Sequence, residues 1–179
     1  MVADISSRSL KAFIAASPLP MTLASPVFED CPLVVANDAF LALTGYRRDE
    51  IIGRNCRFLQ GPASEMASRA RLRAAIDSQS DALVSITNYR KDGALFQNLV
   101  FVLPIFAESG ALLYMLGSQC DVSLPSRKLT ALEHAQVLDE AIEATGPRLA
   151  RQDSLRVLTS QPCVEAARGL ATKGTGTRH

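Results

Sequence analysis

Histidine is scarce in this sequence, because the 179 residues include only His134 and His179. There are four cysteines and no Cys-x-x-Cys pair; the cysteines are Cys31, Cys56, Cys120 and Cys163. Structural zinc sites need closely spaced cysteine or histidine ligands, so a site of that kind is excluded. We also expect no histidine in the core, which excludes a histidine-dependent catalytic triad there.

An excess of one charge sign is also missing, because 19 Lys and Arg stand against 18 Asp and Glu. A formal net charge of +1 gives no long-range attraction to nucleic acid or to an anionic membrane. The longest apolar run, residues 99–107, is interrupted by Pro104 and is far shorter than the roughly 18 residues of a membrane-spanning helix. No secretory signal is recognisable at the N-terminus, so we expect a cytoplasmic protein with reduced cysteines.

The composition that remains, 47% hydrophobic and 21% charged, is typical of one globular domain with appended segments. Apolar spacing predicts a helix over residues 7–17, and β-forming runs at 21–24 and 33–36 predict a pair of strands. Several small helices should follow: one capped by Asn37 and ended by Gly45, one over 47–52, a short one from Asn55, and a longer one from a Ser64 cap to about residue 78.

From residue 82 the apolar pattern changes to that of strands. Runs starting at residues 82, 94 and 112 are separated by Lys91-Asp92-Gly93 and Glu108-Ser109-Gly110, which are typical hairpin turns. The sequence therefore predicts an α+β fold, a five-stranded antiparallel sheet with helices inserted after the second strand and covering one face. A cavity between the sheet and these helices would suit a planar ligand.

After residue 125 the sequence is rich in Ala, Leu and Glu. We expect a helix over 126–144, a break at Thr145-Gly146-Pro147, a second helix over 149–160, and a final turn after Pro162 as far as residue 170. The predicted organisation is an N-terminal helical cap (1–19), an α+β domain (20–125), a C-terminal helical extension (126–171) and a disordered tail (172–179).

The most specific motif is the nonapeptide Gly53-Arg-Asn-Cys-Arg-Phe-Leu-Gln-Gly61. Taken alone, Cys56 is best interpreted as a small buried side chain and Arg57 as a surface charge. Together with the distant segments 88–93, 96–98 and 117–121, however, the motif closely resembles the LOV subfamily of PAS domains. The resemblance extends over residues 20–122 and implies the PAS/LOV fold, a blue-light photoreceptor and a bound flavin.

By this resemblance, Cys56 matches the photoactive cysteine, which adds reversibly to flavin C4a under blue light. Arg57 and Arg73 match the pair that holds the ribityl phosphate, so the expected cofactor is FMN. Arg69 and Arg71 point elsewhere on the helix and are expected to be exposed.

The other site residues follow from the same resemblance. Asn88, Asn98 and Gln119 match three amides that read the polar edge of the ring, and Gln119 would relay the light signal to the sheet and the flanking helices. Asn55 and Gln60 should lie near the flavin and its ribityl chain. The remaining cavity positions are Thr22, Leu59, Ile76, Val100, Val102, Met115 and Gly117.

Two positions depart from the pattern of the subfamily. Gln97 stands where Trp is common, and alternation along its strand should place it on the face away from the flavin. Thr22 stands where Val or Ile is frequent, which predicts an altered rate of dark recovery.

The next predictions concern the output, which is the downstream change that the light signal would cause. We expect no enzyme activity, because the residues after 125 contain no phosphate-binding signature of a kinase or cyclase. A homodimer with light-dependent affinity or geometry is favoured, with a possible downstream protein partner on the C-terminal helices. Alternatives are a DNA-binding helix-turn-helix in those helices, and a PAS ligand or redox sensor without a photocycle. The other three cysteines are expected to be structural, although Cys120 could be redox-active.

Overall fold

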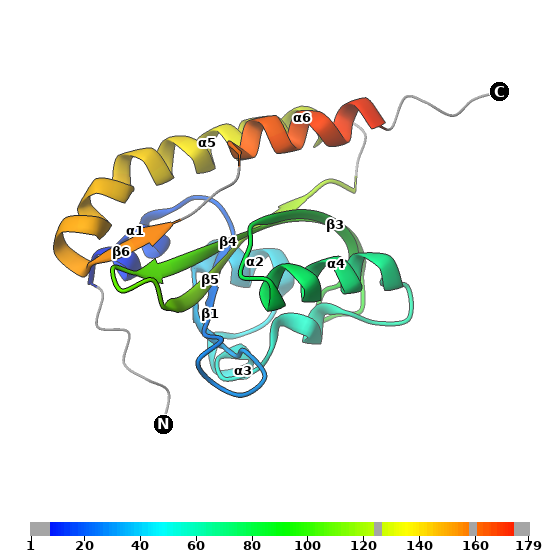
Figure 1. The fold of residues 1–179 in the computed structure, drawn as a ribbon. Helices are drawn as coiled ribbons and strands as arrows, with labels where there is room; N and C mark the ends of the chain where they lie inside the picture. Colours follow the sequence, from blue (N-terminus) through cyan, green and yellow to red (C-terminus); the bar gives the residue numbers. More distant parts are fainter. Residues whose placement is uncertain (1–7, 124–126, 158–160, 174–179) are drawn as a thin grey trace.

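The computed structural model describes residues 8–123, 127–157 and 161–173. An antiparallel sheet lies between two layers of helices, with α5 and α6 on one side and α2, α3 and α4 on the other (Figure 1). Its path of five strands has the order β2-β1-β5-β4-β3, which confirms the predicted five-stranded sheet. The strands are β1 (Met21–Ala24), β2 (Leu33–Ala36), β3 (Ala82–Tyr89), β4 (Leu95–Ala107) and β5 (Leu112–Asp121).

The segment between β2 and β3 forms the helical layer on the cavity side of the sheet. Its elements are α2 (Asp38–Thr44), α3 (Arg48–Ile51), the 3-10 helix η1 (Cys56–Leu59) and α4 (Met66–Asp77). The predicted Ser64 cap is wrong, because α4 begins two residues later. The Ser64 hydroxyl instead accepts from the Gly61 N–H (3.0 Å) and donates to the Thr87 carbonyl (2.5 Å), so it joins the loop to β3.

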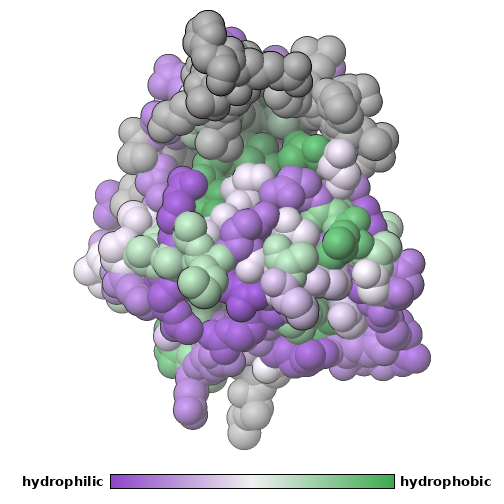
Figure 2. Space-filling model, turned by 90° about the vertical axis from the view of Figure 1, so that its right-hand side faces the viewer, coloured by the Kyte–Doolittle hydropathy of each residue, from purple (hydrophilic) through white to green (hydrophobic). Residues whose placement is uncertain are grey.

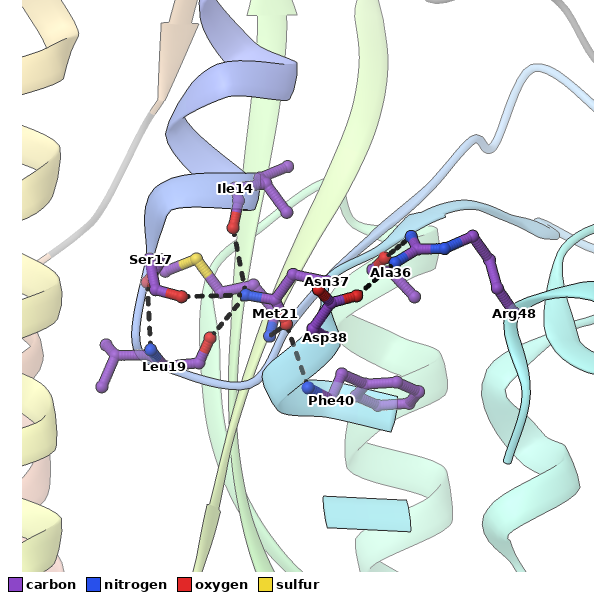
Figure 3. Close-up of polar contacts among 9 residues, drawn as sticks. All are labelled: Ile14, Ser17, Leu19, Met21, Ala36, Asn37, Asp38, Phe40 and Arg48. Carbon is purple, nitrogen blue, oxygen red and sulfur yellow. Dashed lines mark hydrogen bonds and ion pairs between the residues drawn. The ribbon is translucent and has the colours of Figure 1, made fainter. Parts of the chain in front are cut away.

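Asn37 is the predicted cap of α2, and its side chain does more than cap the helix. Its Oδ1 accepts from the N–H of Phe40 and from that of Met21, both at 3.0 Å. Its Nδ2 lies 2.8 Å from the Leu19 carbonyl and 3.0 Å from that of Ile14 (Figure 3). One buried amide therefore connects the end of α1, the start of β1 and the first turn of α2.

The opposite face of the sheet is covered by α1 (Arg8–Ala16), α5 (Arg127–Arg148) and α6 (Cys163–Lys173). The predicted break at residues 145–147 is wrong, because α5 continues with Pro147 inside it and widens only afterwards, into a π-helical turn, η2 (Leu149–Asp153). The Asp139 carboxylate of α5 accepts from the N–H groups of Cys163 (2.8 Å) and Val164 (2.9 Å), which fixes the start of α6.

The second helix that the sequence predicted over residues 149–160 is helical only at its start, in η2, and a sixth strand, β6 (Leu155–Val157), follows where the helix was expected to continue. Strand β6 pairs antiparallel with the end of β4, with Ile105 opposite Val157 and Ala107 opposite Leu155. The physical reason lies in β4, which extends beyond the last residue that β3 pairs, Val102, and so offers unpaired backbone groups. The predicted end of that helix, residues 158–160, falls outside the described residues.

The C-terminus differs from the prediction in a second way. Helix α6 reaches Lys173, so residues 172 and 173, which were assigned to a disordered tail, are helical. The rest of that tail, residues 174–179, lies outside the described residues, as do residues 1–7 of the expected N-terminal cap.

The sheet separates two apolar regions. On the face covered by α1, α5 and α6, Leu10, Ile14, Phe101, Leu116 and Leu138 belong to the largest buried cluster. His134 of α5 lies on this face and is only 6% exposed. The expectation of no core histidine is therefore wrong, although His134 is not among the side chains that line the cavity on the other face.

The surface seen in Figure 2 mixes hydrophilic and hydrophobic side chains. The large hydrophobic side chains that are most exposed in the described part of the chain come from separate elements; they are Val27, Met66, Leu95 and Val137. No described helix is both long enough and apolar enough to cross a membrane.

Candidate functional site: a cavity between the sheet and η1

A cavity lies between the sheet and the helices that follow β2. Most of its lining comes from strand residues that alternate toward it, as the period of two requires. Fourteen of the fifteen predicted site residues line it: Thr22, Asn55, Cys56, Arg57, Leu59, Gln60, Ile76, Asn88, Asn98, Val100, Val102, Met115, Gly117 and Gln119. The sequence analysis missed six other lining residues, Ala24, Cys31, Leu33, Leu72, Ile86 and Leu116.

Three amides form the polar wall of the cavity. Asn88, Asn98 and Gln119 are each less than 5% exposed and come from β3, β4 and β5. Asn98 Nδ2 donates to Asn88 Oδ1 at 2.9 Å, and Gln119 Nε2 donates to Thr22 Oγ1 at 3.4 Å. Asn98 Oδ1 and Gln119 Oε1, by contrast, are buried and accept no hydrogen bond from the described residues.

Gly117 keeps the space beside Gln119 open. A Cβ at this position would lie 2.8 Å from Gln119 Nε2 and 2.8 Å from Thr22 Oγ1, closer than side chains tolerate. Position 117 therefore requires glycine as long as both polar side chains keep their places.

Cys56 begins η1, a helix capped by Asn55, whose Oδ1 accepts from the Arg57 N–H at 2.9 Å. The Asn55 Nδ2 also donates to the Asp30 carbonyl at 2.5 Å, and this holds η1 against the loop that carries Cys31. Burial, and to a lesser extent the neighbouring Cys31, raises the pKa of Cys56 to about 12. Cys56 is therefore a protonated thiol at neutral pH, with no thiolate character for nucleophilic catalysis.

A groove beside the cavity collects three arginines, Arg57, Arg69 and Arg73. Arg73, the one predicted site residue outside the cavity lining, is exposed here, while Arg57 pairs with the carboxylate of Asp30. Arg69 was expected to be exposed, and this is wrong, because it is half-buried and donates to the Gly61 carbonyl. Its Nε is buried and has no hydrogen-bond partner among the described residues. The groove therefore offers donors to an anion.

Strand periodicity predicts which way a side chain faces more sharply than helix periodicity does, as Gln97 and Arg69 show. Gln97 lies on the sheet face away from the cavity, as alternation predicts, where its Nε2 donates to Ser85 Oγ at 2.8 Å. Helix α4 gives no equally sharp signal, because Arg69, Arg71 and Arg73 are spaced two apart and the sequence alone does not fix which of them faces the groove. Arg71 is exposed, as expected.

The cavity can be tested against the flavin that the sequence resemblance implies. A buried acceptor without a donor costs about 1–3 kcal/mol, so Asn98 Oδ1 and Gln119 Oε1 are unfavourable unless a ligand donates to them. A flavin ring presents N–H and carbonyl groups along one edge, and it matches a wall of amides that can both donate and accept. The apolar residues opposite and the cationic groove fit the rest of such a molecule, so the residues present fit a phosphorylated flavin.

Comparison with known proteins agrees with this site. A family model described as PAS domain matches residues 18–123. Blue-light-activated histidine kinase 1 of Erythrobacter litoralis is 40% identical over 144 residues, which are 80% of this chain and 40% of that protein. The chain thus spans less than half the length of this curated relative.

Solved structures show the same arrangement. The crystal structure of the Rhodobacter sphaeroides LOV protein matches with a TM-score of 0.78 and 31% identity over 94% of this chain and 97% of that one. The light-state dimer of the fungal blue-light photoreceptor Vivid matches with a TM-score of 0.57 and 33% identity over 59% of this chain and 78% of that one. The chain belongs to the PAS-domain family and, within it, to the LOV subfamily.

Proposed function

We propose that this chain is a blue-light photoreceptor that binds FMN and in which Cys56 bonds reversibly to flavin C4a in the light. The observation that carries the proposal is that one cavity is lined by Cys56 and by two amides, Asn98 and Gln119, whose buried oxygens accept no hydrogen bond from the residues that the structure describes. The blue-light-activated relative from Erythrobacter litoralis supports it.

The flavin and the residues that line the cavity have separate roles in the proposed reaction. When bound, the flavin supplies absorption of blue light and an electrophilic carbon at C4a. Cys56 supplies the thiol, and its raised pKa keeps the sulfur protonated in the dark, so that light and not a neighbouring base starts the reaction. Asn88 and Asn98 orient the ring by its polar edge. Gln119 can present either its oxygen or its N–H, and so can respond when the protonation of the ring changes.

The absorption spectrum of the purified protein tests the proposal. The parent protein is expected to be yellow and to lose its blue absorption reversibly under blue light. Cys56→Ala should retain the flavin and lose the bleaching. Cys120→Ala is the matched control, because Cys120 is buried on the other face of the sheet and should leave bleaching intact. A Cys56→Ala protein that bleaches and recovers like the parent would refute the assigned chemistry.

The choice of FMN over a flavin without phosphate is supported by the arginine groove. Charge-assisted bonds to a phosphate contribute about 1.5–3 kcal/mol each, so Arg73→Gln should weaken FMN binding about tenfold or more. Riboflavin binding should hardly change. Equal losses for both ligands would contradict a phosphate site at Arg73.

Thr22 is proposed to tune the recovery in the dark through its contact with Gln119. Thr22→Val removes the oxygen that accepts from Gln119 Nε2, and we expect a changed rate of dark recovery. Thr22→Ser retains a hydroxyl and should recover at nearly the parental rate. Identical kinetics in all three proteins would refute this role.

For the output we propose a homodimer whose affinity or geometry changes with light, and a downstream protein partner that binds the C-terminal helices. The light-state dimer of Vivid supports the general idea. The sheet face away from the cavity is already covered by α1, α5 and α6, so the proposed interface uses the solvent-facing surfaces of these helices. Phosphoryl transfer is not part of the proposal, because the match covers only 40% of the kinase.

The alternative of a DNA-binding helix-turn-helix finds no support in the extension. A π-helical turn and β6 separate α5 from α6, and β6 is part of the sheet. Size-exclusion profiles over a range of concentrations, in darkness and under blue light, test the dimer. Profiles that coincide at every concentration would refute a light-dependent association.

A further inference from the structure

Directly behind the cavity, the strand that carries Gln119 makes a polar contact with helix α5. Ser118 precedes Gln119 on β5 and, by alternation, faces the opposite side of the sheet. The Ser118 hydroxyl is fully buried and lies 2.8 Å from His134 Nε2. Consecutive residues of one strand thus contact the cavity and α5.

The neighbouring strand holds the other side of the imidazole ring. His134 stacks on Phe101 of β4, with ring centroids 5.6 Å apart and planes inclined by 12°. Phe101 is the register partner of Ser118, and the next pair along the two strands, Val100 with Gln119, lines the cavity. His134 therefore packs against the cross-strand residue pair that is next to the pair that would contact the flavin.

The rest of this interface is apolar. Ala131, Ala135 and Leu138 are the other buried residues of α5 from residue 131 onward, where its side chains are described, and they belong to the largest hydrophobic cluster. His134 is the one buried polar side chain that the described part of α5 contributes. Apolar contacts have little directionality, whereas a hydrogen bond weakens steeply with a change in angle or distance. A small shift of β5 would therefore be transmitted to α5 chiefly through the contact between Ser118 and His134.

We propose that the hydrogen bond between Ser118 and His134 couples the strand of Gln119 to α5, so that a light-dependent rearrangement at Gln119 changes how firmly α5 is held on the sheet. This inference rests on the proposed photoreceptor function and names the route by which its signal leaves the cavity. His134 is a positioning residue in this route, because it does not line the cavity. Burial lowers its pKa to about 4, so the ring is neutral at physiological pH and fits a hydrogen bond to a neutral hydroxyl.

Hydrogen–deuterium exchange of the flavin-loaded full chain, in darkness and under blue light, tests the coupling. In the parent protein, peptides that cover residues 131–148 should exchange faster in the light. His134→Phe retains a ring to stack on Phe101 but loses the hydrogen bond, and Ser118→Ala removes the hydroxyl. In both variants dark-state protection of α5 should fall about fivefold, the factor that corresponds to one ordinary hydrogen bond, and the difference between light and dark should disappear.

The controls separate coupling from photochemistry. Gln136→Ala changes an exposed residue of α5 and should keep the parental difference between light and dark. The double variant of Ser118 and His134 should lose no more protection than either single variant, because the two residues share one bond. Blue-light bleaching, recorded on each sample, should be of parental amplitude in all of them.

The outcomes distinguish the two proposals. A parent protein that does not bleach refutes the photoreceptor function and the coupling with it. A parent that bleaches without any light-dependent change in the exchange of α5 refutes the coupling alone. Variants of Ser118 or His134 that bleach normally and keep the full difference in α5 exchange between light and dark would also refute the coupling alone.

Discussion

Acidification from pH 7 to pH 5 should destabilise the folded dark state chiefly through one side chain, His134. Burial lowers the pKa of this imidazole from 6.5 to about 4. Between these values the unfolded chain binds a proton that the folded chain does not, so stability falls as the pH falls. The stability that comes from keeping this imidazole neutral is complete above pH 6.5 and is lost as the pH falls to about 4.

The size of the effect follows from the two pKa values of His134. The free energy of unfolding should decrease by about 2 kcal/mol between pH 7 and pH 5, and by about 3 kcal/mol when the pH is below 4. Hydrogen bonds hold the pKa of Glu50 and that of Glu65 below the ordinary value, so the stabilisation from these carboxylates is lost only at lower pH. The interval from pH 7 to pH 5 therefore isolates the histidine.

Urea unfolding of the flavin-saturated protein in darkness, at pH 7 and at pH 5, measures this difference. His134→Phe removes the titrating group while keeping an aromatic ring on Phe101, and it should lose most of the pH dependence. Ser118→Ala keeps the buried imidazole and should retain it. If His134→Phe loses as much stability between pH 7 and pH 5 as the parent, the argument from burial is refuted.

Three further substitutions test other parts of the structure. Gly117→Ala should displace the Gln119 amide and change dark recovery severalfold, since its Cβ would lie 2.8 Å from Gln119 Nε2; unchanged recovery kinetics would contradict this. Asn37→Ala should lower the urea-derived free energy of unfolding by about 3 kcal/mol, because one amide serves several backbone groups; a loss below about 1 kcal/mol would argue against that role. Arg69→Gln should weaken FMN binding more than Arg71→Gln does in a fluorescence titration, and equal effects would remove Arg69 from the anion groove.

The strands were accessible from sequence because they depend on local patterns, and the cavity residues were accessible because their motifs resemble those of the LOV subfamily. Hairpin turns such as Asp92-Gly93 fix where strands begin and end, and alternation then decides that Asn98 faces the cavity while Gln97 does not. Cys56 is marked by a contiguous motif. These features need no knowledge of distant contacts.

Other features depend on contacts that no local pattern contains. Residues 155–157 form a strand because the far end of β4 offers unpaired backbone groups, and that need arises some fifty residues earlier in the chain. His134 occurs on an amphipathic helix, and its burial depends on a hydroxyl of β5 and a ring of β4. Cys31 occurs in a turn-like stretch, and its place beside Cys56 depends on the bond between Asn55 and Asp30.

The pairing of β6 with β4 has a consequence for anyone who divides this protein into modules. A fragment ending at residue 123 would leave Ile105, Phe106 and Ala107 with an open backbone and uncover the apolar face that α5 protects. Open strand backbones beside apolar side chains promote aggregation. A minimal light-sensing fragment for fusion to another protein should therefore extend through β6 and α6, and a linker is better joined after residue 173 than after β5.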